Sequence, residues 1–254
     1  MKKNNLLALL LFVIIGLSSC KDDIKETTVV EKKIQLIANP NLLTVINIMK
    51  PDSNNKDNVL TLLKEGINET MRKQHGYISS NVHSSLDNEY IINYSQWKTG
   101  EDLQAAGELV GSGGAPKMAQ AFSLSSPDYH PFQVTAQYKS NSNKKVYIDY
   151  KNDVLTIVNI LKPIDGVSQA ELAELLKVAL ADELVTQEGF ISSTVHESMD
   201  NDYIVNYSQW TNSDALNTMV ARLQSGNAPK LGLAFSNATP DFHPFTIVSS
   251  HFAN

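Results

Sequence analysis

A long internal repeat is the feature that most constrains how this chain can fold. Residues 76–97 read GYISSNVHSSLDNEYIINYSQW, and residues 189–210 read GFISSTVHESMDNDYIVNYSQW, with 16 identities in 22 positions at an offset of 113. An upstream segment, TVINIMKP from Thr44, returns as TIVNILKP from Thr156 at an offset of 112. The chain therefore contains two tandem copies of one folding unit.

Each copy predicts the element order β-α-β-β-α-β. Strand one is rich in β-branched residues (Leu42–Met49 and Leu155–Leu161), and a capping box at Ser168 begins helix one of the second copy. The element boundaries fall at capping, turn-forming or strand-breaking residues, which are Pro51 and Pro163 after strand one, Gly76 and Gly189 after helix one, Asn88 and Asn201 in the hairpin, Thr99 and Asn212 before helix two, and Pro131 and Pro244 before the last strand.

This element order is the split β-α-β ferredoxin-like arrangement, which belongs to the α+β class. A single sheet of this kind carries helices on one face and needs a cover for the other. Two copies in one chain can cover each other, so we expect an intrachain pseudo-dimeric α+β barrel in a monomer, with a partly polar chamber between its halves. The predicted boundaries are 41–140 for repeat one, 141–153 for a linker and 154–254 for repeat two.

The N-terminus has the pattern of an exported lipoprotein. The apolar run Leu6–Leu17 is too short to span a bilayer and has the length of a signal-peptide core. It ends in LSSC at Cys20, which resembles the lipobox of bacterial lipoproteins, and the KDD that follows resembles an export tag for the cell surface. We expect a signal peptide over residues 1–19, a lipid-anchored tether over 20–40, and an outer-membrane, surface-exposed location. An uncleaved anchor with an incidental cysteine is the alternative.

Composition excludes some partners. The formal net charge is −6 and no lysine- or arginine-rich face is evident, which argues against a nucleic-acid partner. Cys20 is the only cysteine, so no disulfide can form within one chain. The sequence contains no His-x-x-x-His pair, cysteine cluster or acidic calcium loop, and we expect no metal site.

Both copies resemble the antibiotic biosynthesis monooxygenase family. The resemblance rests on a strand ending in Lys-Pro, a helix ending in Gly, a Ser-rich second strand and a third strand ending in Tyr-Ser-Gln-Trp before a capped helix. It covers roughly residues 42–138 and 154–252. Members of this family are dimeric α+β barrels; some oxygenate quinols or polyketide phenols without metal or flavin, and one branch degrades haem.

The resemblance marks one asparagine and one tryptophan in each copy. In the haem-degrading branch an Asn on strand one and a Trp ending strand three line the pocket, and these positions match Asn47 with Trp97 and Asn159 with Trp210. The haem-ligating His of that branch is absent, because the matching positions hold glycine and valine (107 and 220). The resemblance therefore implies a cofactor-independent site, with haem binding less favoured.

Side-chain alternation extends this candidate site. Trp97 shares a strand face with Asn93 and Ser95, and the second copy places Asn206 and Ser208 beside its own Trp in the same way. Tyr94 and Tyr207 are further candidates to donate a hydrogen bond to a substrate. The alternatives are that the tryptophans fill the core between sheet and helix, that the strand-one asparagines form interstrand amide bonds or contacts at the barrel seam, and that the tyrosines are packing residues.

Histidine supplies the candidate acid/base groups, because imidazole titrates near neutral pH. We select His83 and His196 on chemical grounds, although a two-residue turn would pair His83 with Ile92 and turn it away from the Trp97 face. The alternative is a surface or structural role. His130 and His243 each precede a proline, and we expect them to be turn residues.

Two functions remain open from the sequence. The first is a surface lipoprotein that oxygenates a small aromatic or quinol substrate as a cofactor-independent monooxygenase. The second is a non-catalytic module that binds a ligand or partner in the same barrel. Whether the protein is an enzyme is left undecided by the residues alone.

Overall fold

The computed structural model describes residues 33–36, 39, 41–52, 54–140, 146–149, 151 and 154–254. The predicted signal peptide and Cys20 lie outside the described residues, as does most of the predicted tether. Within these described ranges, no helix combines the length and the apolar character that a membrane crossing needs.

Both repeats adopt the predicted element order, with two additional short helices in each, one directly after helix one and one after helix two. The first repeat contains β2 (Leu43–Pro51), α1 (Lys56–Glu69), η1 (Met71–Lys73), β3 (Tyr77–Ser85), β4 (Ile91–Trp97), α2 (Gly100–Gly111), α3 (Pro116–Ser123) and β5 (Ser125–Lys139). The second contains β7 (Leu155–Pro163), α4 (Gln169–Ala179), η2 (Leu180–Leu184), β8 (Phe190–Ser198), β9 (Ile204–Trp210), α5 (Ser213–Gln224), α6 (Pro229–Ser236) and β10 (Ala238–Phe252). The helices α3 and α6 follow short glycine-containing segments, residues 111–114 and 225–226. Each begins with a proline, whose missing N–H is harmless in the first turn of a helix.

Local sequence signals explain where the helices and turns fall. Ser168 and Glu171 exchange the two hydrogen bonds of the predicted capping box at the start of α4. Asn88 and Asn201 occupy the hairpin turns with φ values of 68° and 64°, a conformation that asparagine adopts more readily than most residues. Gly76 also has a positive φ. The sequence predicted that Gly76 ends helix one directly, but η1 lies between α1 and this glycine.

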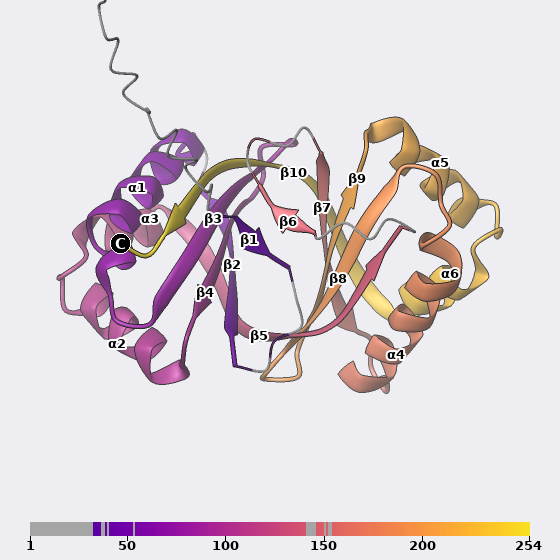
Figure 1. Cartoon of the computed structure of the whole chain (residues 1–254), viewed down its shortest axis with the longest axis horizontal. Coiled ribbons are helices and arrows are strands. Elements are labelled where there is room, and N and C mark those ends of the chain that lie inside the picture. The colour runs from indigo at the N-terminus through magenta and orange to yellow at the C-terminus, as the bar shows by residue number, and fades with distance from the viewer. Residues whose placement is uncertain are drawn as a thin grey trace, which may run out of the picture. The chain divides into compact units, whose positions relative to one another are not determined.

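The two sheets join into one closed barrel of eight strands in the order β10-β3-β4-β2-β5-β8-β9-β7 (Figure 1). Closure depends on two long strands that change partner midway. Strand β5 pairs with β2 up to Phe132 and with β8 of the second repeat from Phe132 onward. Strand β10 does the same with β7 and β3, changing partner at Phe245. The predicted intrachain pseudo-dimeric α+β barrel is confirmed.

The last strand of each repeat begins earlier than predicted. We expected these strands to start after Pro131 and Pro244, but they start at Ser125 and Ala238. Before the change of partner each strand pairs on one side only, so its other edge makes no ladder hydrogen bonds. A proline is tolerated on such an edge because its missing N–H has no strand to bond.

The barrel interior is filled by side chains from the inner faces of both half-barrels. The largest of these are fully buried and belong to one apolar cluster: Ile46, Ile92, Tyr94, Phe132, Tyr207 and Phe245. The predicted polar chamber between the halves is therefore wrong. Alternation along the strands turns these side chains inward and leaves the four asparagines of the predicted site (Asn47, Asn93, Asn159 and Asn206) on the outer faces, toward the helices.

Two short strands extend this interior cluster. Strand β1 (Ile34–Gln35), in the predicted tether, pairs with β6 (Tyr147–Ile148), in the predicted linker. Ile34 and Ile148 are buried in the same cluster as the barrel interior. The Gln209 side chain also donates a hydrogen bond to the Tyr147 carbonyl at 3.0 Å. Both connecting segments thus contribute to the packing of the barrel.

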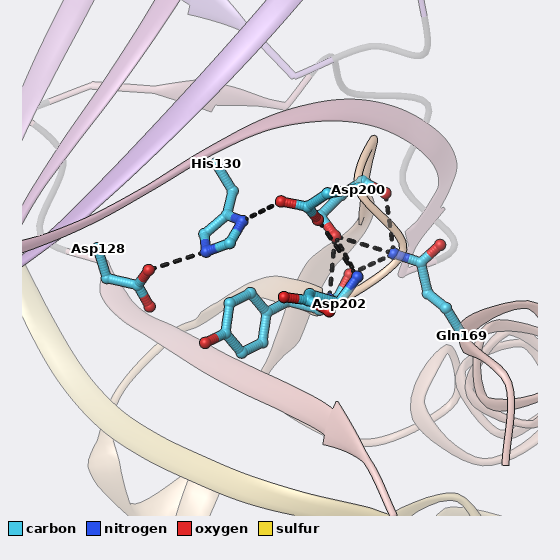
Figure 2. Close-up of polar contacts among 7 residues, drawn as sticks. Asp128, His130, Gln169, Asp200 and Asp202 are labelled. Carbon is cyan, nitrogen blue, oxygen red and sulfur yellow. Dashed lines mark hydrogen bonds and ion pairs between the residues drawn. The ribbon is translucent and has the colours of Figure 1, made fainter. Parts of the chain in front are cut away.

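A histidine–aspartate bridge joins the repeats at each change of partner. Figure 2 shows the His130 ring between Asp128, on the same strand, and Asp200, in the β8–β9 turn of the other repeat. The two nitrogen–oxygen distances are 2.8 Å to Asp128 and 2.5 Å to Asp200. His130 lies within β5, so its predicted position in a turn is wrong.

The second repeat forms the matching bridge. His243, on β10, contacts Asp241 at 2.7 Å and Asp87, in the β3–β4 turn, at 2.5 Å. This histidine too lies within a strand and not in a turn. Burial alone would lower the pKa of His243, but the hydrogen bonds to Asp87 and Asp241 outweigh it, and the pKa is raised. Burial likewise opposes ionisation of Asp87, yet its hydrogen bonds, chiefly the one to His243, lower its pKa to about 2.

We predict that His243→Phe lowers the free energy of unfolding by about 1–2 kcal/mol at pH 6, because two part-exposed carboxylates lose a charged donor while the ring packing is kept. Because the pKa of His243 is raised on folding, the stabilisation by the bridge is complete below about pH 6.5 and is lost as the pH rises through the folded-state pKa of His243. Because the pKa of Asp87 is lowered on folding, the same stabilisation is complete above about pH 4 and is lost as the pH falls toward 2. Urea titrations at pH 6 and pH 9 test this.

The control is His75→Asn, which removes an ion pair to Asp102 whose histidine side chain is 90% exposed. We expect a smaller effect for this variant. A His243→Phe defect that is as large at pH 9 as at pH 6 would contradict the charged form of the bridge.

Candidate active site

Each repeat has a pocket between its own half of the sheet and its own helices. The pocket of the first repeat has a volume of about 520 Å³, and the pocket of the second has about 260 Å³. Strands β2, β3, β4 and β5 form the floor of the first pocket, and α2 with α3 forms its cover. We call these the first pocket and the second pocket.

The floor of the first pocket carries a row of polar side chains across three neighbouring strands. Asn47 on β2 is paired directly with Asn93 on β4 and with Tyr129 on β5. Directly opposite residues in antiparallel strands share a face, with Cβ atoms about 4.5–5.5 Å apart. All three residues line the pocket, so the row presents two amides and a phenol at spacings close to the width of an aromatic ring.

The two asparagines of this row have hydrogen-bonding capacity to spare. Asn47 is 5% exposed and Asn93 is 8% exposed. The Oδ1 atoms of both are buried and have no hydrogen-bond partner within the described part of the chain. A buried acceptor without a donor costs free energy, and a functional site is one place where a fold retains such a group. An interstrand amide bond, the alternative role considered for Asn47, is not formed with Asn93.

Aromatic rings form one end of the first pocket. Trp97 and Tyr77 meet edge to face, with ring centroids 5.2 Å apart. The Trp97 indole N–H donates a hydrogen bond to Ser95 Oγ at 3.2 Å, which fixes the ring orientation. Trp97 therefore does both things expected of it, since it packs between the sheet and α2 and also lines the pocket.

The hydroxyl groups of the first pocket remain protonated at neutral pH. Burial raises the pKa of Tyr77 well above its usual range, and it raises the pKa of Tyr129 to about 12. Both phenols are therefore hydrogen-bond donors. The open side of the pocket is formed by exposed residues, among them Tyr129 and Glu108, and Glu108 is the one carboxylate among the lining residues.

The second pocket is built on the same plan but is narrower and less polar. Asn159 pairs with Asn206 and with Phe242, so the row ends in a ring without a hydroxyl. The Oδ1 of Asn159 has no partner in the described structure, whereas Asn206 accepts a hydrogen bond from Ser193. Trp210 lines this pocket and donates to Ser208 Oγ at 3.1 Å.

Four of the predicted site residues lie outside both pockets. His83 and His196 are fully buried on the inner face of the barrel, and each bonds a tyrosine of the other repeat at 3.0 Å, Tyr207 and Tyr94 respectively. Burial lowers the pKa of both histidines to about 4, so both are neutral at pH 7. Their assignment to the site is corrected: alternation along β3, β4, β8 and β9 turns these four side chains away from the helices.

The positions that would hold a haem ligand carry none. Gly107, on α2, lines the first pocket, and Val220, on α5, lines the second. Neither residue has a side chain that can bind iron. Across the residues that the structure describes, there is no group of three or more histidine, cysteine, aspartate or glutamate residues placed to hold a metal ion.

Sequence reasoning missed both tyrosines of the first pocket, Tyr77 and Tyr129. Tyr77 precedes a β-bulge, so simple alternation does not predict its face. Tyr129 was assigned to a loop, because the last strand was predicted to begin too late. The available signal was the difference between copies, since the second repeat has Phe190 and Phe242 at these two positions.

Comparisons with known proteins agree with this fold. Residues 42–108 match the family model described as antibiotic biosynthesis monooxygenase. The fold is similar to that of an anthrone oxidase-like protein, with a TM-score of 0.73 and 22% identity, covering 88% of this chain and 97% of the other. It is also similar to a candidate monooxygenase from Fusobacterium nucleatum, with a TM-score of 0.55 and 7% identity, covering 83% and 94%.

One curated relative matches in sequence. It is the tetracenomycin-F1 monooxygenase of Streptomyces glaucescens, 27% identical over 66 residues. The match covers 26% of this chain and 59% of the length of that relative.

We predict that Asn47→Leu raises the free energy of unfolding by about 1 kcal/mol, because it removes a buried acceptor that has no donor and places a good strand side chain there. The contrasting variant is Ser95→Ala, which leaves the buried Trp97 N–H without its acceptor. We expect that change to lower stability by about 1–2 kcal/mol. Urea unfolding followed by tryptophan fluorescence measures both, and a loss of stability in Asn47→Leu would show that its amide has a structural partner.

Proposed function

We propose that the antibiotic biosynthesis monooxygenase domain of this chain is an oxygenase without a bound cofactor, which acts on a small aromatic or quinol substrate in the first pocket. The observation that carries the proposal is the row of polar groups on the floor of an otherwise apolar, aromatic-walled cavity. Such a pocket binds a flat ring through its walls and orients it through a few hydrogen bonds. The names of two similar proteins, an anthrone oxidase-like protein and a tetracenomycin-F1 monooxygenase, support oxidation chemistry.

The chemistry requires an electron-rich substrate. An ionised phenol or quinol gives one electron to O2, and the substrate radical and superoxide then combine, forming a C–O bond at a ring carbon. Where that carbon carries two hydrogens in the keto form, loss of water from the peroxide leaves a carbonyl. One oxygen atom of O2 enters the product, the other leaves as water, and all electrons come from the substrate.

The pocket residues have three tasks in this reaction. The Oδ1 atoms of Asn47 and Asn93 accept hydrogen bonds from hydroxyl groups of the substrate and so position its ring. The protonated hydroxyl of Tyr129 donates a hydrogen bond to a ring oxygen and stabilises negative charge there when the substrate ionises. Glu108, at the open side, can carry the released proton to solvent, and the walls that include Trp97 limit the access of water to the peroxide.

The alternative is a module that binds the same kind of ligand without turning it over. One observation favours it: no histidine lines the first pocket, and its one carboxylate is exposed. Ionisation would then depend mainly on the substrate's own acidity. Binding without oxygen consumption is the result that this alternative predicts.

We further propose that the protein is held at the outer membrane, exposed at the cell surface, by acyl chains on Cys20. The sequence pattern around Cys20 supports this proposal. Acyl chains anchor a protein through buried methylene groups and need no membrane-spanning helix.

We predict oxygen consumption when the purified protein is mixed with hydroquinones or naphthols, measured with an oxygen electrode. In Trp97→Phe/Trp210→Phe the rate should fall at least tenfold, because the smaller ring loses the bond to Ser95 and positions the substrate loosely. Tyr138→Phe, an aromatic change outside both pockets, is the matched control and should retain the rate. A haemin titration run in parallel should give no spectral shift.

Circular dichroism verifies that the double variant is folded. No oxygen uptake with any substrate of the panel would reject the oxygenase in favour of the binding module, and a saturable haemin spectrum would reject both.

We predict that Cys20→Ser moves the protein from the membrane fraction to the soluble fraction of the producing cells, because the acylated thiol is lost. Fractionation and metabolic labelling with a fatty acid test this. Retention of the variant in the membrane fraction would favour the uncleaved anchor instead.

A further inference from the structure

The two pockets differ at the few positions that determine their size. Ala106 and Gly107 on α2 line the first pocket, and their counterparts in the second are Met219 and Val220 on α5. A Cβ atom placed on Gly107 would meet no atom within 4 Å, so the space above this residue is open. The larger side chains of α5 fill the corresponding space, in keeping with the smaller volume of the second pocket.

The pockets also differ in the groups that can bind a polar ring. Tyr77 and Tyr129 of the first pocket are replaced by Phe190 and Phe242 in the second repeat. In the first repeat Ser80 lies close to the Tyr77 hydroxyl. Where phenylalanine removes that hydroxyl, the matching serine bonds the side chain of Asn206 instead. The row of the second pocket therefore keeps one amide oxygen without a partner, on Asn159. The row of the first pocket keeps two such oxygens, on Asn47 and Asn93, and also has the phenol of Tyr129.

We propose that the repeats have divided their roles, so that the first pocket alone binds substrate. Its ligand is a flat phenol or hydroquinone of fused rings, with oxygens on opposite edges that meet Asn93, Asn47 and Tyr129. The second pocket is closed to this ligand by Met219 and Val220. This inference rests on the proposed function for its ligand class, but it concerns binding and stoichiometry and needs no turnover.

The row geometry accounts for the choice of a fused ring. Neighbouring strands place the polar groups about one ring-width apart, so oxygens on opposite edges of one ring can meet adjacent members of the row. The pocket volume of about 520 Å³ leaves room for further rings beside Trp97, beyond the one that the row holds. The second pocket has half that volume.

The test is anaerobic calorimetric titration of the purified protein with 1,4-dihydroxynaphthalene, so that no oxygenation can occur. We expect one ligand per chain. The probe 1,4-dimethoxynaphthalene has the same ring system but cannot donate a hydrogen bond to the asparagine oxygens, and it should bind at least tenfold more weakly. Two equivalent sites per chain, or equal affinity for both probes, would overturn the proposal.

Exchange of the wall residues supplies matched variants. Ala106→Met with Gly107→Val gives the first pocket the walls of the second, and we expect binding to be abolished. The opposite change, Met219→Ala and Val220→Gly together with Phe190→Tyr and Phe242→Tyr, opens the second pocket, and we expect two ligands per chain. Unchanged stoichiometry in the first of these variants would overturn the proposal.

Tyr129→Phe keeps the ring and removes one donor, so it tests the row without a change in packing. It should weaken binding of the dihydroxy probe about tenfold, because the Tyr129 hydroxyl donates a hydrogen bond to a ring oxygen. Unchanged affinity of this variant for the dihydroxy probe would reject that contact. One bound ligand per chain without oxygen uptake in air would reject the oxygenase and retain the division of roles. Oxygen uptake with two equal binding sites per chain would retain the oxygenase and reject the division of roles.

Discussion

The exchange of strand ends between the repeats is the constraint on which the rest of the structure depends. Because β5 and β10 each pair first with their own repeat and then with the other, neither half-barrel has a closed sheet without its partner. Closure buries the inner faces against each other and leaves the outer faces to the helices. The first pocket therefore lies on the outer face, where α2 and α3 cover it. The histidine bridges at the points of exchange add directional contacts to a junction that backbone pairing has already formed.

The fold could be predicted from the sequence because two of its determinants are local. The repeat specifies two equal units, and alternation with capping and turn residues, such as Ser168 and Asn88, specifies the elements of each. The change of partner at Phe132 could not be predicted, because it depends on which strand lies beside β5. The early start of that strand, through Pro131, follows from the same fact. The filled interior was missed because ring volumes, of Tyr94 above all, decide whether a barrel holds a chamber.

The candidate site was predicted in part, and for clear physical reasons. Asn47 could be predicted because it is a polar side chain within an apolar strand. Side-chain alternation from Trp97 then identifies Asn93 and Ser95. The buried histidines were selected for their chemistry alone, and desolvation makes that chemistry unavailable at neutral pH. The register that brings Tyr129 beside Asn47 comes from a pairing between distant segments, which spacing along the chain does not show.

Duplication makes the differences between the repeats more informative than their identities. Each bridge needs a histidine from one repeat and an aspartate from the other, so a change in either copy weakens the shared junction. Both copies retain their members, Asp87 and His130 in the first repeat and Asp200 and His243 in the second. The pockets share no residue, so one can change without cost to the other. Substitutions that accumulate on one pocket wall, with larger groups and fewer hydroxyls, are then the expected trace of a single working site in a barrel that still needs both halves to close.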